Sequence, residues 1–237
     1  MTGRVPIALV LLTLAVVNVW VHVGPRRAQL LTGPLAAAFL LGVGRAAGLT
    51  WDELGLGPGS LAQGVRWGGV CAGVVIMGYA VVLSVRPAHR FFRDTRYRLG
   101  IRSAVATAFL AVPLGTVLFE EVAFRGVLWA LVEDTKGPVW ATAVTSLLFG
   151  AWHVLPALDL ARTNTSLAGS GSRAKLAATV LGTVAFTAAA GVLFAELRRH
   201  SGSLLAPILL HWATNAAGVL GSAIVWGISR GRSRPAG

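Results

Sequence analysis

The chain has 237 residues, of which 55% are hydrophobic and only 13% are charged, and its mean hydropathy is +0.70. Soluble domains carry about 25% charged residues, so the composition excludes an ordinary soluble protein and predicts an integral membrane protein. The net charge of +12 would suit a nucleic-acid-binding protein, but the arginines lie in short gaps between apolar runs, where they set orientation in a bilayer.

Seven apolar runs approach the length of about 20 residues that a membrane helix needs. The sequence therefore predicts an all-α, polytopic transmembrane helix bundle of about seven spans, with six to eight as the range, forming a single membrane domain over residues 1–237. The first run is longer than the apolar region of a signal peptide, so we expect it to be retained as a span. The segment 50–60 is expected at the membrane interface. The runs cover residues 5–23, 28–48, 65–85, 103–132, 138–156, 176–198 and 203–229.

Loop charges predict the orientation of this bundle. Six arginines lie between residues 86 and 102, in the gap between the third and fourth runs. Because positively charged loops stay in the cytoplasm, we expect this gap inside, the N-terminus outside, and the C-terminus with its basic tail 230–237 inside. On this assignment 14 of the 21 Lys and Arg residues lie in inside loops and 6 in outside loops. The pair Arg198 and Arg199 lies in the one outside loop whose positive charge disagrees with this orientation.

The fourth, fifth and seventh runs carry ionisable side chains, which are costly inside a membrane and usually serve a function there. Glu121 and Arg125 are four residues apart on a helix, so they share a face and can neutralise each other. Glu120 points about a quarter turn away from that face and is the carboxylate left free for chemistry. The full set of candidate residues is Glu120, Glu121, Arg125, His153, His211 and Asn215.

These side chains lie at comparable depth in the predicted bundle. Counted from the outer ends of their runs at 1.5 Å per residue, Glu120, His153 and His211 fall within about 10 Å of depth, so they could meet in one cavity. Structural roles are the alternative: the Glu–Arg pair could lock the helices, His153 could be an interfacial residue, and Asn215 could hydrogen-bond between helices. The combination on three spans favours a functional site.

The motifs that contain these residues resemble the CPBP family of intramembrane proteases, which includes the type II CAAX prenyl endopeptidases and the bacteriocin-processing or self-immunity (ABI) proteins. The family is marked by Glu-Glu-x-x-x-Arg, Phe-x-x-x-His and His-x-x-x-Asn on successive membrane helices. Residues 120–125, 149–153 and 211–215 match this order and spacing. The resemblance covers roughly 103–220, the expected catalytic core, and leaves 1–100 as variable N-terminal spans.

The resemblance implies an intramembrane endopeptidase that cuts near the C-terminus of a prenylated or membrane-associated substrate. Glu120, with His153, would activate a water molecule. His211 and Asn215 would stabilise the oxyanion, and the Glu–Arg pair would hold the geometry. The expected partners are a peptide or protein substrate and the lipid bilayer, with no nucleic acid, and the Arg-rich, Lys-poor composition points to a bacterial plasma membrane.

A divalent metal is a further expectation, since the family is commonly called a metalloprotease. Glu120, His153 and His211 could supply the three ligands of a catalytic zinc site, but the sequence has no HExxH signature, and a metal-free glutamate mechanism would use the same residues. Two other functions stay open. Intramembrane Glu and His also mark proton-coupled transporters, although no inverted repeat is evident, and a non-catalytic immunity or scaffold protein could keep these residues for structure.

Overall fold

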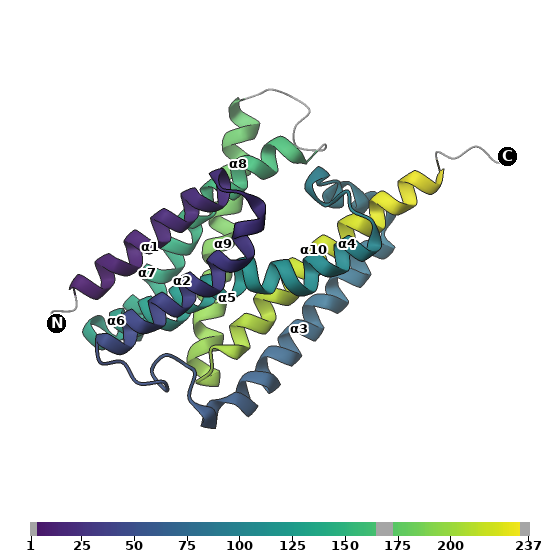
Figure 1. The fold of residues 1–237 in the computed structure, drawn as a ribbon. Coiled ribbons are helices and arrows are strands. Elements are labelled where there is room, and N and C mark those ends of the chain that lie inside the picture. The colour runs from purple at the N-terminus through teal and green to yellow at the C-terminus, as the bar shows by residue number, and fades with distance from the viewer. Residues whose placement is uncertain (1–3, 165–172, 233–237) are drawn as a thin grey trace.

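The computed structural model describes residues 4–164 and 173–232, and the regular elements in those ranges are helices (Figure 1). Six helical segments there are long and apolar enough to cross a membrane. Their outer faces expose large apolar side chains, such as Val74 and Phe186, which are 68% and 69% exposed. Because soluble proteins rarely leave wide apolar surfaces in water, these findings confirm an integral membrane protein built as an all-α bundle.

The helices follow the predicted runs in chain order, with one difference. The second predicted run, 28–48, forms a helix that begins with two arginines, contains Pro34 and has a shorter apolar part, Leu30–Ala46. The six remaining spans agree with the lower bound of the prediction. Apart from the helix Ile101–Lys136, which is described below, the elements are α1 (Arg4–Val23), α2 (Arg26–Ala46), η1 (Pro58–Ser60), α3 (Leu61–Ser84), η2 (Arg86–Phe92), η3 (Thr95–Tyr97), α7 (Pro138–Trp152), α8 (Val154–Thr163), α9 (Arg173–Ser201) and α10 (Leu205–Arg232).

One continuous helix from Ile101 to Lys136 carries the two glutamates. It is longer than the predicted run 103–132, and its backbone alternates between α and π turns. A π turn begins directly after Glu121, and π turns inside α-helices are frequent at functional sites. The segments are α4 (Ile101–Ala106), the π turns η4 (Thr107–Ala111) and η5 (Pro113–Val117), α5 (Leu118–Glu121), the π turn η6 (Val122–Leu128) and α6 (Trp129–Lys136).

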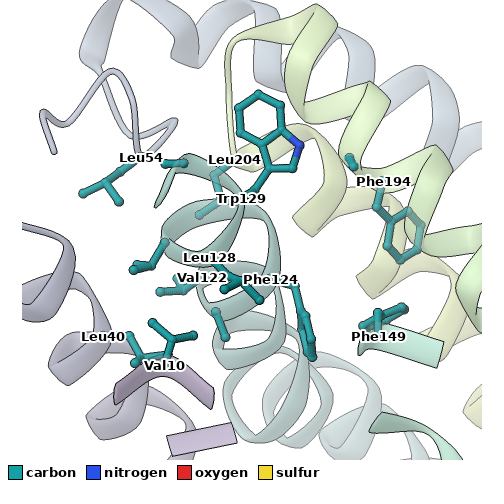
Figure 2. Close-up of a cluster of buried hydrophobic side chains, with 14 of the residues drawn as sticks. Val10, Leu40, Leu54, Val122, Phe124, Leu128, Trp129, Phe149, Phe194 and Leu204 are labelled. Carbon is teal, nitrogen blue, oxygen red and sulfur yellow. The ribbon is translucent and has the colours of Figure 1, made fainter. Parts of the chain in front are cut away.

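The hydrophobic core surrounds η6 and α6. Figure 2 shows Val122, Phe124, Leu128 and Trp129 of this helix among apolar side chains of its neighbours. Every residue from 119 to 132 is buried, so this stretch is enclosed on all sides by protein. The two glutamates and the arginine in it must therefore find their partners inside the bundle.

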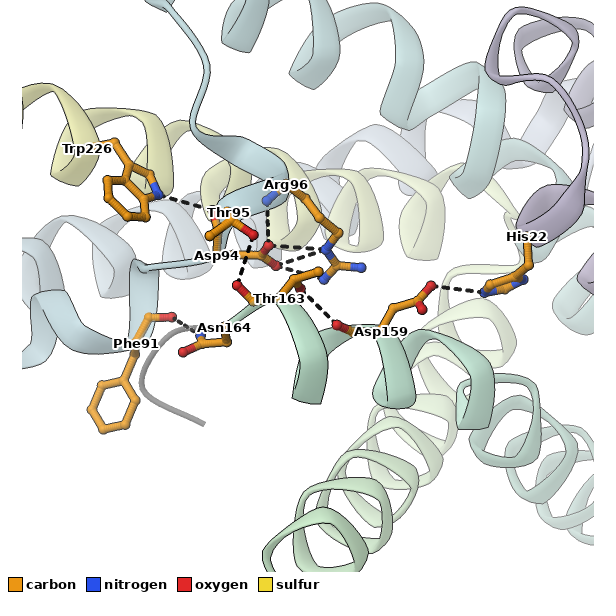
Figure 3. Close-up of polar contacts among 9 residues, drawn as sticks. All are labelled: His22, Phe91, Asp94, Thr95, Arg96, Asp159, Thr163, Asn164 and Trp226. Carbon is orange, nitrogen blue, oxygen red and sulfur yellow. Dashed lines mark hydrogen bonds and ion pairs between the residues drawn. The ribbon is translucent and has the colours of Figure 1, made fainter. Parts of the chain in front are cut away.

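Hydrogen bonds join loops that were predicted to lie on the same side of the membrane. Thr95 Oγ1 donates to the carbonyl of Thr163 at 3.0 Å, and Trp226 Nε1 donates to the carbonyl of Asp94 at 3.0 Å (Figure 3). These bonds join the link between α3 and α4, the end of α8 and the last turns of α10. We call this the Arg-rich end, because it holds the link 86–102 with its six arginines. That it faces the cytoplasm stays a prediction.

Arg198 and Arg199, the pair that disagrees with the predicted orientation, lie at the opposite end of the bundle, and both side chains have partners there. Arg198 is only 4% exposed, and its Nη2 donates to the carbonyl of Glu53 at 2.8 Å. Arg199 lies 2.6 Å from the carboxylate of Glu196. Arg198 thereby holds the segment 50–60 against the end of the bundle, which gives this positive cluster a structural role.

Small residues allow α9 to approach α7 closely beside the buried arginine. A Cβ placed on Gly191 would lie 3.0 Å from Ser146 Cα and 3.3 Å from Arg125 Nη2. Because α9 would have to move away, Gly191→Ala is expected to lower the free energy of unfolding by about 1–3 kcal/mol. Gly182→Ala on the same helix meets nothing within 4 Å and should be neutral or stabilising. Thermal unfolding in detergent compares the two variants, and equal Tm values would contradict the close contact.

Candidate active site

Glu121 is the centre of a buried charged group that joins two helices. Its Oε1 lies 3.1 Å from Arg125 Nη1 on the same helix and 2.7 Å from His211 Nδ1 on α10. Glu121 and Arg125 are fully buried, and His211 is 4% exposed. The predicted Glu121–Arg125 pair is confirmed. Because an ionised carboxylate can only accept, His211 carries its hydrogen on Nδ1 and leaves Nε2 for another partner.

Aromatic rings enclose the guanidinium of Arg125. Its Cζ lies 4.0 Å from the ring centroid of Phe149 and 5.0 Å from that of Phe194. The faces of these rings attract a cation and take the place of water around it. An arginine can stack flat on such rings and still bind a carboxylate, which a lysine cannot do. Phe149 therefore supports the buried charge, a role that the sequence did not assign to it.

Glu120 has different partners from Glu121. Its Oε1 accepts a hydrogen bond from Trp152 Nε1 at 3.0 Å. Its Oε2 has no hydrogen-bond partner among the described residues and lies 3.9 Å from His211 Nε2. Because the arginine binds Glu121, Glu120 is the carboxylate left free by that ion pair, as the helical spacing predicted.

His153 lies at the junction of α7 and α8 rather than within a helix. Its Nδ1 is 2.8 Å from the carbonyl of Phe149, and the two rings pack with centroids 4.5 Å apart. Since a carbonyl only accepts, Nδ1 carries the hydrogen and Nε2 is left free. The hydrogen bonds and ion pairs of the described residues connect Glu120 to His211 and Trp152, and the predicted role of His153 beside Glu120 stays a prediction.

Asn215 lies one turn beyond His211 on α10, and its side chain is half-buried. The spacing of four residues places both on one face of that helix. In the described part of the chain, no hydrogen bond involves the Asn215 amide. Its predicted contact with a reacting oxyanion stays a prediction.

The zinc site considered from the sequence does not form in this arrangement. Among the described residues, no three His, Cys, Asp or Glu side chains are placed to hold a metal ion. Nδ1 of His211 binds Glu121, and Nδ1 of His153 binds a backbone carbonyl. These bonds leave the Nε2 atom of each ring available as a ligand, but among the described residues Glu120, His153 and His211 are not gathered around one point, and the use of a metal stays a prediction.

A cavity of about 610 Å³ reaches Glu120. Glu120 and Trp152 line it, together with residues from the end of α1, the link before α4, and α8. At the Arg-rich end its wall includes His22, Arg96 and Asp159, and His22 Nε2 lies 3.7 Å from Asp159 Oδ2 (Figure 3). The cavity therefore leads from the Arg-rich end of the bundle to the free carboxylate.

A second cavity of about 870 Å³ lies between α3, α9 and α10. Its lining is mostly apolar and includes Phe194 and Leu210. The ring centroid of Phe194 is 5.2 Å from that of His211, so this cavity approaches the histidine. It has the lining that an apolar chain requires.

Trp152 and α1 are the parts of this site that the sequence did not predict. Trp152 stands directly before His153 in a recognised motif, so its position was a usable signal. The contribution of α1 left no comparable signal in the sequence, because the contact between Asn18 and Trp152 joins residues 134 positions apart.

Comparison with known families locates the similarity in the same part of the chain. Residues 102–217 match the model of a family described as Type II CAAX prenyl endopeptidase Rce1-like. The matched segment contains all the candidate site residues and none of α1, α2 or α3. Neither the curated proteins nor the solved structures give a match to the chain.

Proposed function

Because residues 102–217 belong to the Rce1-like type II CAAX prenyl endopeptidase family, a family of membrane proteases, we propose that this protein is an intramembrane endopeptidase whose catalytic base is Glu120. One observation carries the assignment of the base. Among the described residues Glu120 Oε2 has no hydrogen-bond partner; it lies 3.9 Å from His211 Nε2 and belongs to a residue that lines a cavity.

The gap between Glu120 and His211 fits a water molecule. Glu120 Oε2 and His211 Nε2 are 3.9 Å apart, and two acceptors cannot bind each other, but one water can donate to both at ordinary distances of about 2.8 Å. With Nδ1 bound to Glu121, Nε2 of neutral His211 is an acceptor, and so is the Glu120 carboxylate. A water that donates both hydrogens turns its remaining lone pairs away from these residues, where they can attack a substrate carbonyl.

Peptide hydrolysis at this position can be written with the protein's own groups. The water oxygen bonds to the scissile carbonyl carbon while Glu120 Oε2 takes its proton. Glu120 then returns that proton to the amide nitrogen as the C–N bond breaks, which releases an amine and a carboxylate. The side-chain N–H of Asn215 would donate to the carbonyl oxygen in this scheme. Donors that bind a developing oxyanion typically contribute about 2.7–4 kcal/mol each.

The two cavities suggest how a substrate would lie. A peptide would enter the polar cavity from the Arg-rich end, which the positive-inside rule places in the cytoplasm. An apolar chain attached to that peptide would have the larger cavity beside His211 available. The proposed substrates are therefore prenylated or otherwise membrane-associated peptides, cut near the C-terminus, in a bacterial plasma membrane.

The test uses the full chain reconstituted in liposomes. A panel of farnesylated and unmodified peptides ending in a CAAX sequence is incubated with the wild type and with Glu120→Gln, and mass spectrometry identifies the products. Cleavage by the wild type alone, unchanged by a chelator, is the expected result. Loss of cleavage with the chelator would assign a metal to the site. Equal product from both proteins, or none from the wild type while sealed vesicles show substrate-dependent proton flux, would contradict the proposal.

A further inference from the structure

The carboxylate of Glu120 is held by a side chain from another helix. Trp152, at the end of α7, donates its indole N–H to Glu120 Oε1 at 3.0 Å. The indole ring packs against Phe119 and Phe124, with centroids 5.9 and 6.0 Å away. A carboxylate bound at one oxygen and a ring fixed by two neighbours cannot rotate freely. The bond therefore determines that Oε2, and not Oε1, faces His211.

The backbone of Trp152 is itself tied to α1. In a continuous helix its carbonyl would accept from the N–H four residues later, but that residue is Pro156, which has no N–H. The side-chain amide of Asn18 supplies the missing donor, since its Nδ2 lies 3.0 Å from the Trp152 carbonyl. The N-terminal helix thus satisfies the backbone group left open where α7 gives way to α8.

The same helix forms a wall of the cavity that leads to Glu120. Val17, Val21 and His22 of α1 line that cavity. His22 also lies 3.7 Å from Asp159 of α8, so α1 meets the α7–α8 segment at two places (Figure 3). All of these α1 residues lie outside the segment that matches the protease family.

From these contacts we infer that Trp152 is a positioning residue for Glu120, and that Asn18 of α1 sets the position of Trp152. This inference rests on the proposed role of Glu120 as the catalytic base. It makes α1 a working part of the active site. The chain from Asn18 to Glu120 passes through one carbonyl and one indole, and each link can be broken by a single substitution.

The first experiment detects the hydrogen bond between Trp152 and Glu120 without any substrate. The eight tryptophans give eight indole N–H signals in the NMR spectrum of the ¹⁵N-labelled full chain in detergent micelles, and Trp152→Phe identifies one of them by its loss. That signal is expected to shift in Glu120→Gln, because a hydrogen bond to a carboxylate is stronger than one to an amide. It is also expected to shift in Asn18→Leu. A signal that stays in place in both variants would overturn the inference, whether or not the protein is a protease.

The second experiment measures kcat and KM on a farnesylated CAAX peptide with a quenched fluorophore. Trp152→Phe keeps most of the ring packing and removes the donor, and we expect kcat to fall about tenfold or more while KM changes little, because a hydrogen bond to a charged group is lost. Asn18→Leu should reduce kcat by a smaller factor. Trp20→Phe is the matched control, since it loses an indole bond to Thr32 outside the cavity and should leave kcat unchanged.

The outcomes separate the two proposals. A Trp152→Phe protein with the kcat of the wild type overturns the positioning role and leaves the protease assignment standing. A wild type that cuts no peptide and gives substrate-dependent proton flux in sealed vesicles overturns the protease assignment, and the indole signal then decides on the contact alone. A fall in kcat that Trp20→Phe shares equally would be a general effect of losing an indole and would count against the inference.

Discussion

Glu120→Gln is expected to reduce cleavage by about 10³-fold, since general acid–base catalysis typically contributes 10²–10⁴. Glutamine has the shape of glutamate, and its amide oxygen can still accept from Trp152 Nε1, whose nitrogen lies 3.0 Å from Glu120 Oε1. An amide cannot take a proton from water at neutral pH, so the base is lost while the packing is kept. The measurement is the initial rate of peptide cleavage in liposomes at equal amounts of protein.

The prediction requires that the variant remain folded. Glu120→Gln should change the free energy of unfolding by no more than about 1 kcal/mol, because no large volume change or new unpaired charge is introduced. Glu133→Gln on α6 of the same continuous helix is the matched control, and its rate should equal that of the wild type. A Glu120→Gln protein that is folded and cleaves at more than about a tenth of the wild-type rate would rule out Glu120 as the base.

The pairing of Glu121 with Arg125 could be derived from sequence because helical spacing alone fixes it. A spacing of four residues places two side chains on one face of a helix. Even with the π turn that begins at Val122, Glu121 Oε1 and Arg125 Nη1 lie 3.1 Å apart. The apolar runs were equally readable, since length and composition decide whether a helix can cross a bilayer. Local periodicity therefore accounts for most of the fold that was predicted.

The partner of Glu120 could not be derived in the same way. Depth counting placed His153 and His211 at similar levels, but it contains no information on which way each ring turns. The structure decides this through Phe149, whose carbonyl binds the His153 ring at 2.8 Å, while Glu121 binds that of His211 at 2.7 Å. Rotation about a helix junction is a property of the packed bundle and not of residue spacing.

The contribution of α1 shows a different limit. The first hundred residues carry no motif, and they were expected to form variable spans. Yet Pro156 removes a backbone donor on one helix, and Asn18 replaces it from another. A proline four residues after Trp152 is visible in the sequence and would leave the Trp152 carbonyl without its helical donor, but only the three-dimensional arrangement shows which side chain binds that carbonyl.

Arg125→Met is expected to lower the free energy of unfolding by about 3–5 kcal/mol, the cost of leaving a buried charge without its partner. Arg125 and Glu121 are both 0% exposed, so no water can replace the guanidinium. Methionine fills a similar volume among Phe149 and Phe194 but brings no charge to the carboxylate. Unfolding of the purified protein in mixed detergent micelles, followed by circular dichroism, measures the loss.

A matched surface pair isolates the effect of burial. Arg199 and Glu196 are separated by 2.6 Å, but their side chains are 41% and 35% exposed, so Arg199→Met should cost only about 0–1 kcal/mol. If the loss in Arg125→Met comes from the stranded carboxylate, adding Glu121→Gln to that variant should recover part of the stability, because an amide is cheaper to bury than a charge. A double variant that is as unstable as the sum of its two single variants would show that Glu121 and Arg125 act independently, and the ion pair would then have no part in holding His211 beside Glu120.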